Sequence, residues 1–234
     1  MSKERQFDNF DENVENYEEL CDSAVKKSGG TREYFSEYKI SEISQYEDCT
    51  EGLNILDFGC GDGSSSVYLR KYFSESNIFG TDVSKTSVKI ASNKQIYNAT
   101  FISYDGSKFP FEDSKFDVVF TSMVFHHIQH KLHAGILSEI YRVLKKGGRF
   151  YNFEHNPINP ITRKLVNECE LDKYAVLLQP SYTKKVTNKN GLKTTNLNYT
   201  LFFPRHKFFK IFLGLEKMLS WCPIGAQYYI RAIK

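Results

Sequence analysis

The stretch Ile55-Leu56-Asp57-Phe58-Gly59-Cys60-Gly61-Asp62-Gly63 decides the fold. It starts as an apolar run typical of a buried strand and ends in three glycines separated by single residues. Gly59 and Gly61 permit a tight turn and a close approach of backbone to a ligand, while Gly63 lets the following helix start close to the sheet. Unpaired amides in the first turn of that helix can bind a polar group. We therefore predict a strand, a ligand-binding turn and a helix, with Asp57 facing a cationic ammonium of the ligand.

An acidic residue follows this glycine loop at an informative distance. Asp82 comes about 20 residues later, at the end of the next predicted strand, in Gly80-Thr81-Asp82-Val83-Ser84. A carboxylate in that place can accept hydrogen bonds from both hydroxyls of a ribose, so loop and acid together indicate an adenosine ligand. Two alternatives remain: a purely structural turn, and a nicotinamide-binding enzyme. The second would require the spacing G-x-G-x-x-G, whereas Ser64 follows Gly63 and no second nucleotide-binding half follows.

Short apolar runs alternate with helical stretches from Leu53 onward, which is typical of βα units around a parallel sheet. The predicted strands are 54–58, 78–81, 100–104, 116–121, 149–153, 197–203 and 227–233. The predicted helices are 64–72, 85–94 and 132–144. The last helix is expected to end in Lys145-Lys146-Gly147-Gly148, because cations offset the negative end of the helix dipole and a glycine can cap it.

Together the glycine loop, Asp82 and the segments 109–117 and 142–148 resemble class I S-adenosylmethionine-dependent methyltransferases over about residues 53–155. The resemblance implies an α/β, Rossmann-like, mostly parallel seven-stranded sheet with the last strand antiparallel and helices on both faces. It also implies S-adenosylmethionine as cofactor, lying across the carboxyl ends of the first strands. By position, the methionine part falls to Gly59, Gly61 and Gly63, the ribose to Asp82 with Val83, the adenine to Tyr104, Asp105 and Gly106, and the sulfonium side to Ser122.

The domain organisation follows from composition. The polar residues 1–50 are expected to form an N-terminal helical extension, and residues 51–234 the methyltransferase domain, with 157–195 as an insertion that shapes the acceptor pocket. Tyr17, Tyr34 and Tyr38 in the extension could form a lid over the cofactor, since excluding water strengthens directed interactions at a charged reacting centre. Ordinary packing of aromatic side chains onto the sheet is the alternative.

Candidate catalytic residues follow the fourth and fifth predicted strands. His126 is the first choice as a base because that strand should end beside the methyl group and histidine titrates near neutral pH. Glu154 and His155 follow the fifth strand, and Asn156 adds an amide that could orient an acceptor. Hydrogen bonding of the histidines in a structural turn, or plain solvation of the charged pair, remains open.

Four histidines, at positions 126, 127, 130 and 133, also suggest a metal site. We expect no metal, because neither a cysteine nor a carboxylate nearby in sequence completes the set and the first two histidines precede the helix. We therefore predict that these histidines lie near one another without binding a metal ion.

Composition limits the remaining possibilities. The net charge is +3, from 31 basic and 28 acidic side chains, which does not favour a nucleic-acid partner. No apolar run reaches the roughly 20 residues of a membrane span. The five cysteines are odd in number and scattered, so we expect reduced thiols in the cytoplasm. The predicted function is methyl transfer to a small molecule, such as a sugar hydroxyl or amine of a surface-glycan or secondary-metabolite pathway. The alternatives are a nucleic-acid methyltransferase and a non-catalytic scaffold.

Overall fold

The computed structural model describes residues 30–203 and 216–234, apart from the side chain of Leu171. The strands are β1 (Asn54–Phe58), β2 (Asn77–Asp82), β3 (Ala99–Ser103), β4 (Phe116–Ser122), β5 (Leu144–His155), β6 (Lys193–Thr200) and β7 (Gln227–Ile233). The α-helices are α2 (Arg32–Ile43), α3 (Ser64–Tyr72), α4 (Lys85–Asn93), α5 (His130–Val143), α6 (Pro160–Asn167) and α7 (Pro180–Lys189). Short 3₁₀ helices are η2 (Phe125–His127), η3 (Glu170–Asp172) and η5 (Lys217–Leu219).

The seven strands form one sheet in the order β3-β2-β1-β4-β5-β7-β6. Strands β1 to β5 pair in parallel, and β7 is antiparallel to both of its neighbours, β5 and β6. The strand order reverses between β1 and β4. In open α/β sheets a crevice forms at such a reversal, outside the carboxyl ends of the strands, and holds the ligand. The predicted fold class, with its mostly parallel sheet and antiparallel last strand, is confirmed.

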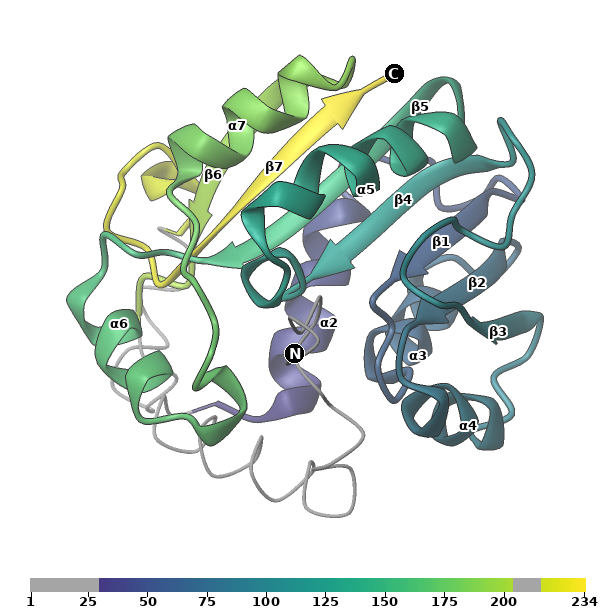
Figure 1. The fold of residues 1–234 in the computed structure, drawn as a ribbon, viewed down its shortest axis with the longest axis horizontal. Coiled ribbons are helices and arrows are strands. Elements are labelled where there is room, and N and C mark those ends of the chain that lie inside the picture. Colours follow the sequence, from purple (N-terminus) through teal and green to yellow (C-terminus); the bar gives the residue numbers. More distant parts are fainter. Residues whose placement is uncertain (1–29, 204–215) are drawn as a thin grey trace, which may run out of the picture.

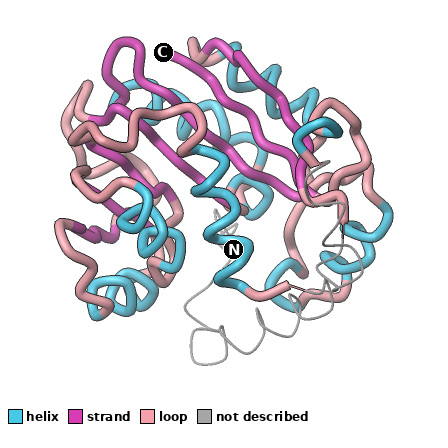
Figure 2. Tube along the Cα trace, turned by 180° about the vertical axis from the view of Figure 1, so that it is seen from behind, coloured by secondary structure: helices cyan, strands magenta, loops and turns pink. Residues whose placement is uncertain are grey.

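Helices cover both faces of the sheet (Figures 1 and 2). Because strand side chains alternate in direction, neighbouring residues belong to two separate hydrophobic cores, one on each face of the sheet. Leu56 of β1 belongs to the core beneath α5, whereas Ile55 belongs to the core that Ile40 of α2 joins. Figure 1 shows α5 and α7 in front of the sheet, and Figure 2, seen from behind, shows α2 crossing the other face. Helix α2 thus lies beside α3, and its first residue, Arg32, forms an ion pair with Asp62 in the glycine loop at the carboxyl end of β1.

The end of helix α5 differs from the prediction. The helix stops at Val143, and β5 starts at once with Leu144, so the Lys-Lys-Gly-Gly segment lies within the strand. The pairing of β4 with β5 jumps between Phe116 and Val118, and Gly147 has a φ of +78° in this irregular stretch. A glycine with positive φ serves a bulge as well as a helix cap, which is why the sequence pattern was ambiguous.

Other boundaries are close to the predictions. Helix α3 has the predicted bounds 64–72, whereas the sixth strand covers Lys193–Thr200 rather than 197–203.

The four cysteines within the described ranges are free thiols. Among the described residues, no helix combines the length and the apolar character that crossing a membrane requires. The helical stretch expected within residues 1–28, including Tyr17, lies outside the described residues.

Candidate active site

The three glycines of the loop after β1 all have positive φ, between +51° and +77°. A Cβ on Gly59 would lie 2.3 Å from Val124, and one on Gly63 would lie 3.0 Å from Ala91 of α4. At Gly61 no described atom lies within 4 Å of such a Cβ. The first and third glycines therefore permit close packing, in the case of Gly63 against helix α4, and the middle one faces open space.

Asp82 at the end of β2 fixes the shape of this loop. Its Oδ2 accepts a hydrogen bond from the Gly61 amide at 2.9 Å, and its Oδ1 accepts one from the Ser84 amide at 2.9 Å. Asp82, which the sequence singled out, thus holds the glycine loop in shape from the end of β2.

A cavity of about 150 Å³ opens at the point where the strand order reverses. Loops after four neighbouring parallel strands contribute to its wall. Of the predicted cofactor residues, Gly59, Gly61, Asp82, Val83, Tyr104 and Ser122 line this cavity. Phe58, Ser87, Met123, Val124, His127 and Ile128 complete the lining. The predicted residues Asp57, Gly63, Asp105 and Gly106 lie outside this lining.

Asp57 lies directly beneath the glycine loop and is buried. The hydroxyl of Ser66 donates a hydrogen bond to its Oδ2 at 2.7 Å. Burial raises the pKa of Asp57 to about 7, with repulsion by Asp82 adding to the rise and the Ser66 hydrogen bond opposing it. A cation bound nearby would favour the charged form of this carboxylate.

The far side of the cavity carries a chain of ionisable groups. Glu154, at the end of β5, places its Oε2 2.5 Å from Nδ1 of His126 and accepts a hydrogen bond from the Phe125 amide at 2.9 Å. On the other side of the imidazole, Oδ1 of Asp172 lies 3.6 Å from Nε2 of His126 and 3.3 Å from Nε2 of His127. Both His126 and Glu154 are almost completely buried. This cluster couples β5, η2 and η3.

The charge states in this cluster differ from residue to residue. Burial lowers the pKa of His126, but the carboxylates of Glu154 and Asp172 outweigh it and raise the pKa to about 9. For His155, burial is the largest effect and, with repulsion by His126, lowers the pKa to about 4. The pKa of Glu154 is lowered despite its burial, because His126 stabilises the carboxylate. At neutral pH one histidine is therefore charged and the other neutral.

Asn156 has a structural role, contrary to our expectation that it orients an acceptor. Its buried side-chain amide donates hydrogen bonds to the carbonyls of Pro223 at 2.9 Å and Gly225 at 2.7 Å. Its Oδ1 accepts one from the Ile158 amide at 3.1 Å. All of its polar atoms are thereby engaged in joining the end of β5 to the segment before β7.

Helix α2 contributes a cation that the sequence analysis missed. Nζ of Lys39 donates a hydrogen bond to Oγ of Ser122 at 2.6 Å, from a side chain that is buried against the sheet. Burial lowers the pKa of Lys39 to about 8, while the carboxylates of Glu154 and Asp57 oppose that shift. Nothing in the polar sequence around Lys39 marks it as a site residue, because its partner lies 83 positions away.

Residues 56–152 match the family model of a methyltransferase domain. The chain thus resembles the methyltransferase family over its central part. The matched residues run from β1 to β5 and so contain the glycine loop, Asp82 and the polar turn after β4.

Relatives support this assignment over part of their length. An uncharacterised methyltransferase of Bacillus subtilis (strain 168) is 30% identical over 125 residues, which are 51% of this chain and 48% of that protein. An uncharacterised methyltransferase of Synechocystis (strain PCC 6803) is 33% identical over 109 residues, which are 46% of this chain and 50% of that protein. The chain spans about half the length of these curated relatives.

A solved structure extends the likeness of the fold to almost the whole chain. An S-adenosylmethionine-dependent methyltransferase from Thermotoga maritima, described as a possible histamine N-methyltransferase, has a TM-score of 0.69 at 20% identity. The superposition covers 96% of this chain and 98% of that one. The fold of this chain is therefore similar to that of a methyltransferase over more residues than the family model matches.

Proposed function

We propose that this protein transfers the methyl group of S-adenosylmethionine to a hydroxyl or amine of a small-molecule acceptor, in the cytoplasm. The observation that carries this proposal is that one cavity borders both Asp82, at the expected ribose position, and His127, at the edge of the buried polar cluster. The cofactor half of such a site and a set of groups able to handle a proton thus lie side by side.

The reaction requires little from the protein beyond alignment. A lone pair of the acceptor forms the new bond to the methyl carbon, and the bond between that carbon and sulfur breaks. Its electron pair stays on sulfur, so the sulfonium becomes a neutral thioether. The proton that the acceptor loses passes to a basic group or to water. Ser122, at the end of β4, is the residue that we assign to the sulfonium side.

Proton handling falls to His126, Glu154 and His155 in this proposal. The low pKa of His155 keeps its imidazole neutral at pH 7, so a ring nitrogen can accept a proton from the acceptor. Glu154 fixes the orientation of the His126 ring through Nδ1, and the carboxylates of Glu154 and Asp172 raise the pKa of His126 above its ordinary value. A cation beside the acceptor would stabilise the negative charge that develops as a hydroxyl loses its proton.

The segment 157–195 forms the acceptor side in this proposal. It contains α6, η3 and α7, and it is tied to the histidine turn because the Val176 amide donates a hydrogen bond to the carbonyl of His126 at 2.8 Å. Asp172 of the same segment reaches the two histidines. Variation in loops at this edge of an α/β sheet sets the choice of substrate.

The test is an assay that follows formation of S-adenosylhomocysteine with a panel of acceptors, starting with nucleotide sugars and small amines and including RNA and DNA. Turnover with a small molecule, slowed more than cofactor binding by His126→Ala, is the expected result. Turnover on nucleic acid alone would support the nucleic-acid alternative. Tight cofactor binding without turnover on any acceptor would support the scaffold alternative, and unchanged turnover of His126→Ala would exclude that residue as a catalytic group.

A further inference from the structure

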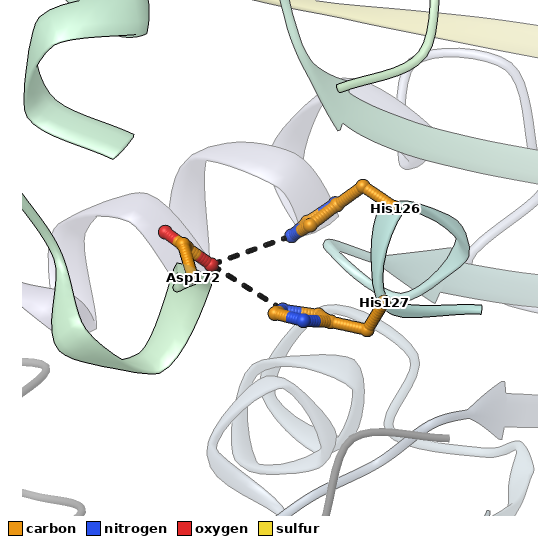
Figure 3. A group of neighbouring side chains, drawn as sticks. All are labelled: His126, His127 and Asp172. Carbon is orange, nitrogen blue, oxygen red and sulfur yellow. Dashed lines mark ion pairs between the residues drawn. The ribbon is translucent and has the colours of Figure 1, made fainter. Parts of the chain in front are cut away.

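Two histidines and one carboxylate converge at the edge of the cavity (Figure 3). His126 and His127 are consecutive residues of η2, and both rings point toward Asp172 of η3. The candidate ligand atoms of the three residues all lie within 4.8 Å of one another. We propose that these three side chains bind a divalent first-row transition-metal ion through the two Nε2 atoms and Oδ1 of Asp172.

The distances match those expected around such an ion. Oδ1 of Asp172 lies 3.3 Å from Nε2 of His127 and 3.6 Å from Nε2 of His126. Zinc bonds to histidine nitrogen and carboxylate oxygen measure about 2.0 to 2.1 Å, so the edge of a tetrahedral site is about 3.3 to 3.4 Å long. Only small movements of the three side chains would bring each donor atom to bonding distance of one ion.

His126 supplies an independent observation that points to a ligand. Its ring is almost completely buried, and among the described residues its Nε2 forms no hydrogen bond, only the 3.6 Å ion pair with Asp172. A buried polar atom without a partner is costly and calls for an explanation. The same ring is held at Nδ1 by Glu154 at 2.5 Å. Metal-binding histidines usually have this arrangement, in which a carboxylate orients the ring and directs the other nitrogen at the ion.

The charges and the anchoring of the three residues also suit a cation. Glu154 and Asp172 place two carboxylates on opposite sides of His126, and a divalent ion would balance both. The hydrogen bond from the Val176 amide to the His126 carbonyl ties the segment that carries Asp172 to the histidine turn. The site is thus held by backbone contacts as well as by its own side chains.

Two imidazoles and one carboxylate are borderline ligands that suit zinc and iron(II) better than magnesium or calcium. Three protein ligands leave at least one coordination position open, as in metal sites that bind water or substrate. His127 and Ile128 also line the cofactor cavity, so the open position lies at its edge. Resting on the proposed function, we assign this position to an oxygen of the acceptor.

The sequence does not indicate this cluster because its carboxylate is distant from the histidines. We expected no metal since no acid near positions 126–133 completed a set. Asp172 lies 46 positions after His126, in a segment where no strand or helix pattern fixes the geometry. Of the four histidines that suggested a metal site in the sequence, only His126 and His127 belong to this cluster.

The experiment is a titration of the untagged full chain, freed of metal, with Co²⁺ as a visible probe, followed by Zn²⁺ and Mg²⁺. One Co²⁺ per chain with the d–d absorption of a nitrogen-containing site, displaced by Zn²⁺ but not by Mg²⁺, is expected. Asp172→Asn and His127→Gln should each weaken Co²⁺ binding by more than the roughly 10- to 100-fold that loss of a ligand's hydrogen-bond partner costs. His130→Gln, at an exposed neighbour outside the cluster, is the matched control and should bind as the unmodified protein does.

No binding of Co²⁺, or binding that is equally strong in both ligand variants, would overturn the proposal. If Asp172→Asn does not fold, His127→Gln decides the matter alone. The titration needs neither cofactor nor acceptor, so it is separable from the proposed function. Absence of Co²⁺ binding in an unmodified chain that does transfer methyl groups would reject only the present inference, while Co²⁺ binding without any methyl transfer would reject only the proposed function.

Discussion

Nζ of Lys39 donates a 2.6 Å hydrogen bond to Oγ of Ser122, which joins a helix that precedes the methyltransferase domain to the end of β4. Lys39 is buried, and the carboxylates of Asp57 and Glu154 both act on its charge. The helix therefore does more than cover the apolar face of the sheet with Ile40 and Ile43. It places a positive charge between the cofactor side and the proposed acceptor side of the site.

Removing this buried charge should change how stability depends on pH. The pKa of Lys39 is about 8 in the folded chain, against an ordinary value of 10.5, so above pH 8 the unfolded chain binds more protons than the folded one. The free energy of unfolding of the unmodified protein should therefore rise relative to that of Lys39→Met, by about 1.4 kcal/mol per pH unit between pH 8 and pH 10. Denaturant unfolding of both proteins over this range measures the difference. A constant difference across the range would contradict the assignment.

Substitution of Gly61 should block the cofactor without a large loss of stability. Gly61→Ala adds a methyl group that points into open space at the cavity wall, and Gly147→Ala adds one at an equally unobstructed position with positive φ in β5, outside the cavity lining. Both changes should cost about 1–2 kcal/mol of stability, because alanine is strained at positive φ. Only Gly61→Ala should weaken binding of S-adenosylmethionine, by tenfold or more, in a calorimetric titration. Equal affinity of the two variants would show that Gly61 does not face the ligand.

Asp57 should make cofactor binding depend on pH. With a pKa of about 7, its carboxyl group is mostly neutral at pH 6 and gains its charge as the pH rises. If it faces the ammonium of the methionine part, affinity for S-adenosylmethionine should increase about fivefold from pH 6 to pH 7, a range in which the ammonium stays protonated. Asp57→Asn can still accept the Ser66 hydrogen bond and should show a flat profile. Parallel pH profiles in both proteins would place Asp57 away from the ammonium.

Asn156 should matter for stability rather than for catalysis. Asn156→Ala would leave the carbonyls of Pro223 and Gly225 and the Ile158 amide without their partner, at a cost of about 2–3 kcal/mol. Asn188→Ala, at an exposed asparagine whose Oδ1 accepts one backbone hydrogen bond, serves as the control and should cost less than about 1 kcal/mol. Denaturant midpoints give both values. Unchanged stability combined with slow turnover would restore the acceptor-binding role for Asn156.

The parts of this structure that depend on local sequence were predictable. Alternation of apolar runs with glycine and aspartate signals placed the five parallel strands β1 to β5, because a buried parallel strand needs a continuous apolar stretch and a turn must follow it. The positive φ of Gly59, Gly61 and Gly63 is likewise a local requirement. Where one local signal has two uses, prediction failed. Gly147 fits a helix cap and a bulge equally, and only the pairing of β4 with β5 decides between them.

Contacts between distant segments were beyond prediction. Lys39 reaches Ser122, and Asp172 reaches His126, only because the sheet brings their elements together. No periodicity or spacing in the sequence predicts these contacts. For the same reason, His126, Glu154 and His155 could be named as candidates from their positions after two strands, while their charge states depend on burial and on Asp172.

Calorimetric titration with S-adenosylmethionine and S-adenosylhomocysteine, with NAD as a negative control, tests the central claim most directly. The account predicts saturable binding of the first two ligands and none of NAD. Asp82→Ala should abolish that binding, because Asp82 shapes the glycine loop through Gly61 and lines the cavity in which we propose that the cofactor binds. Asp113→Ala, which removes an exposed carboxylate paired with Arg142, should bind normally. Failure of the folded protein to bind either ligand, or equal binding by Asp82→Ala, would contradict the account.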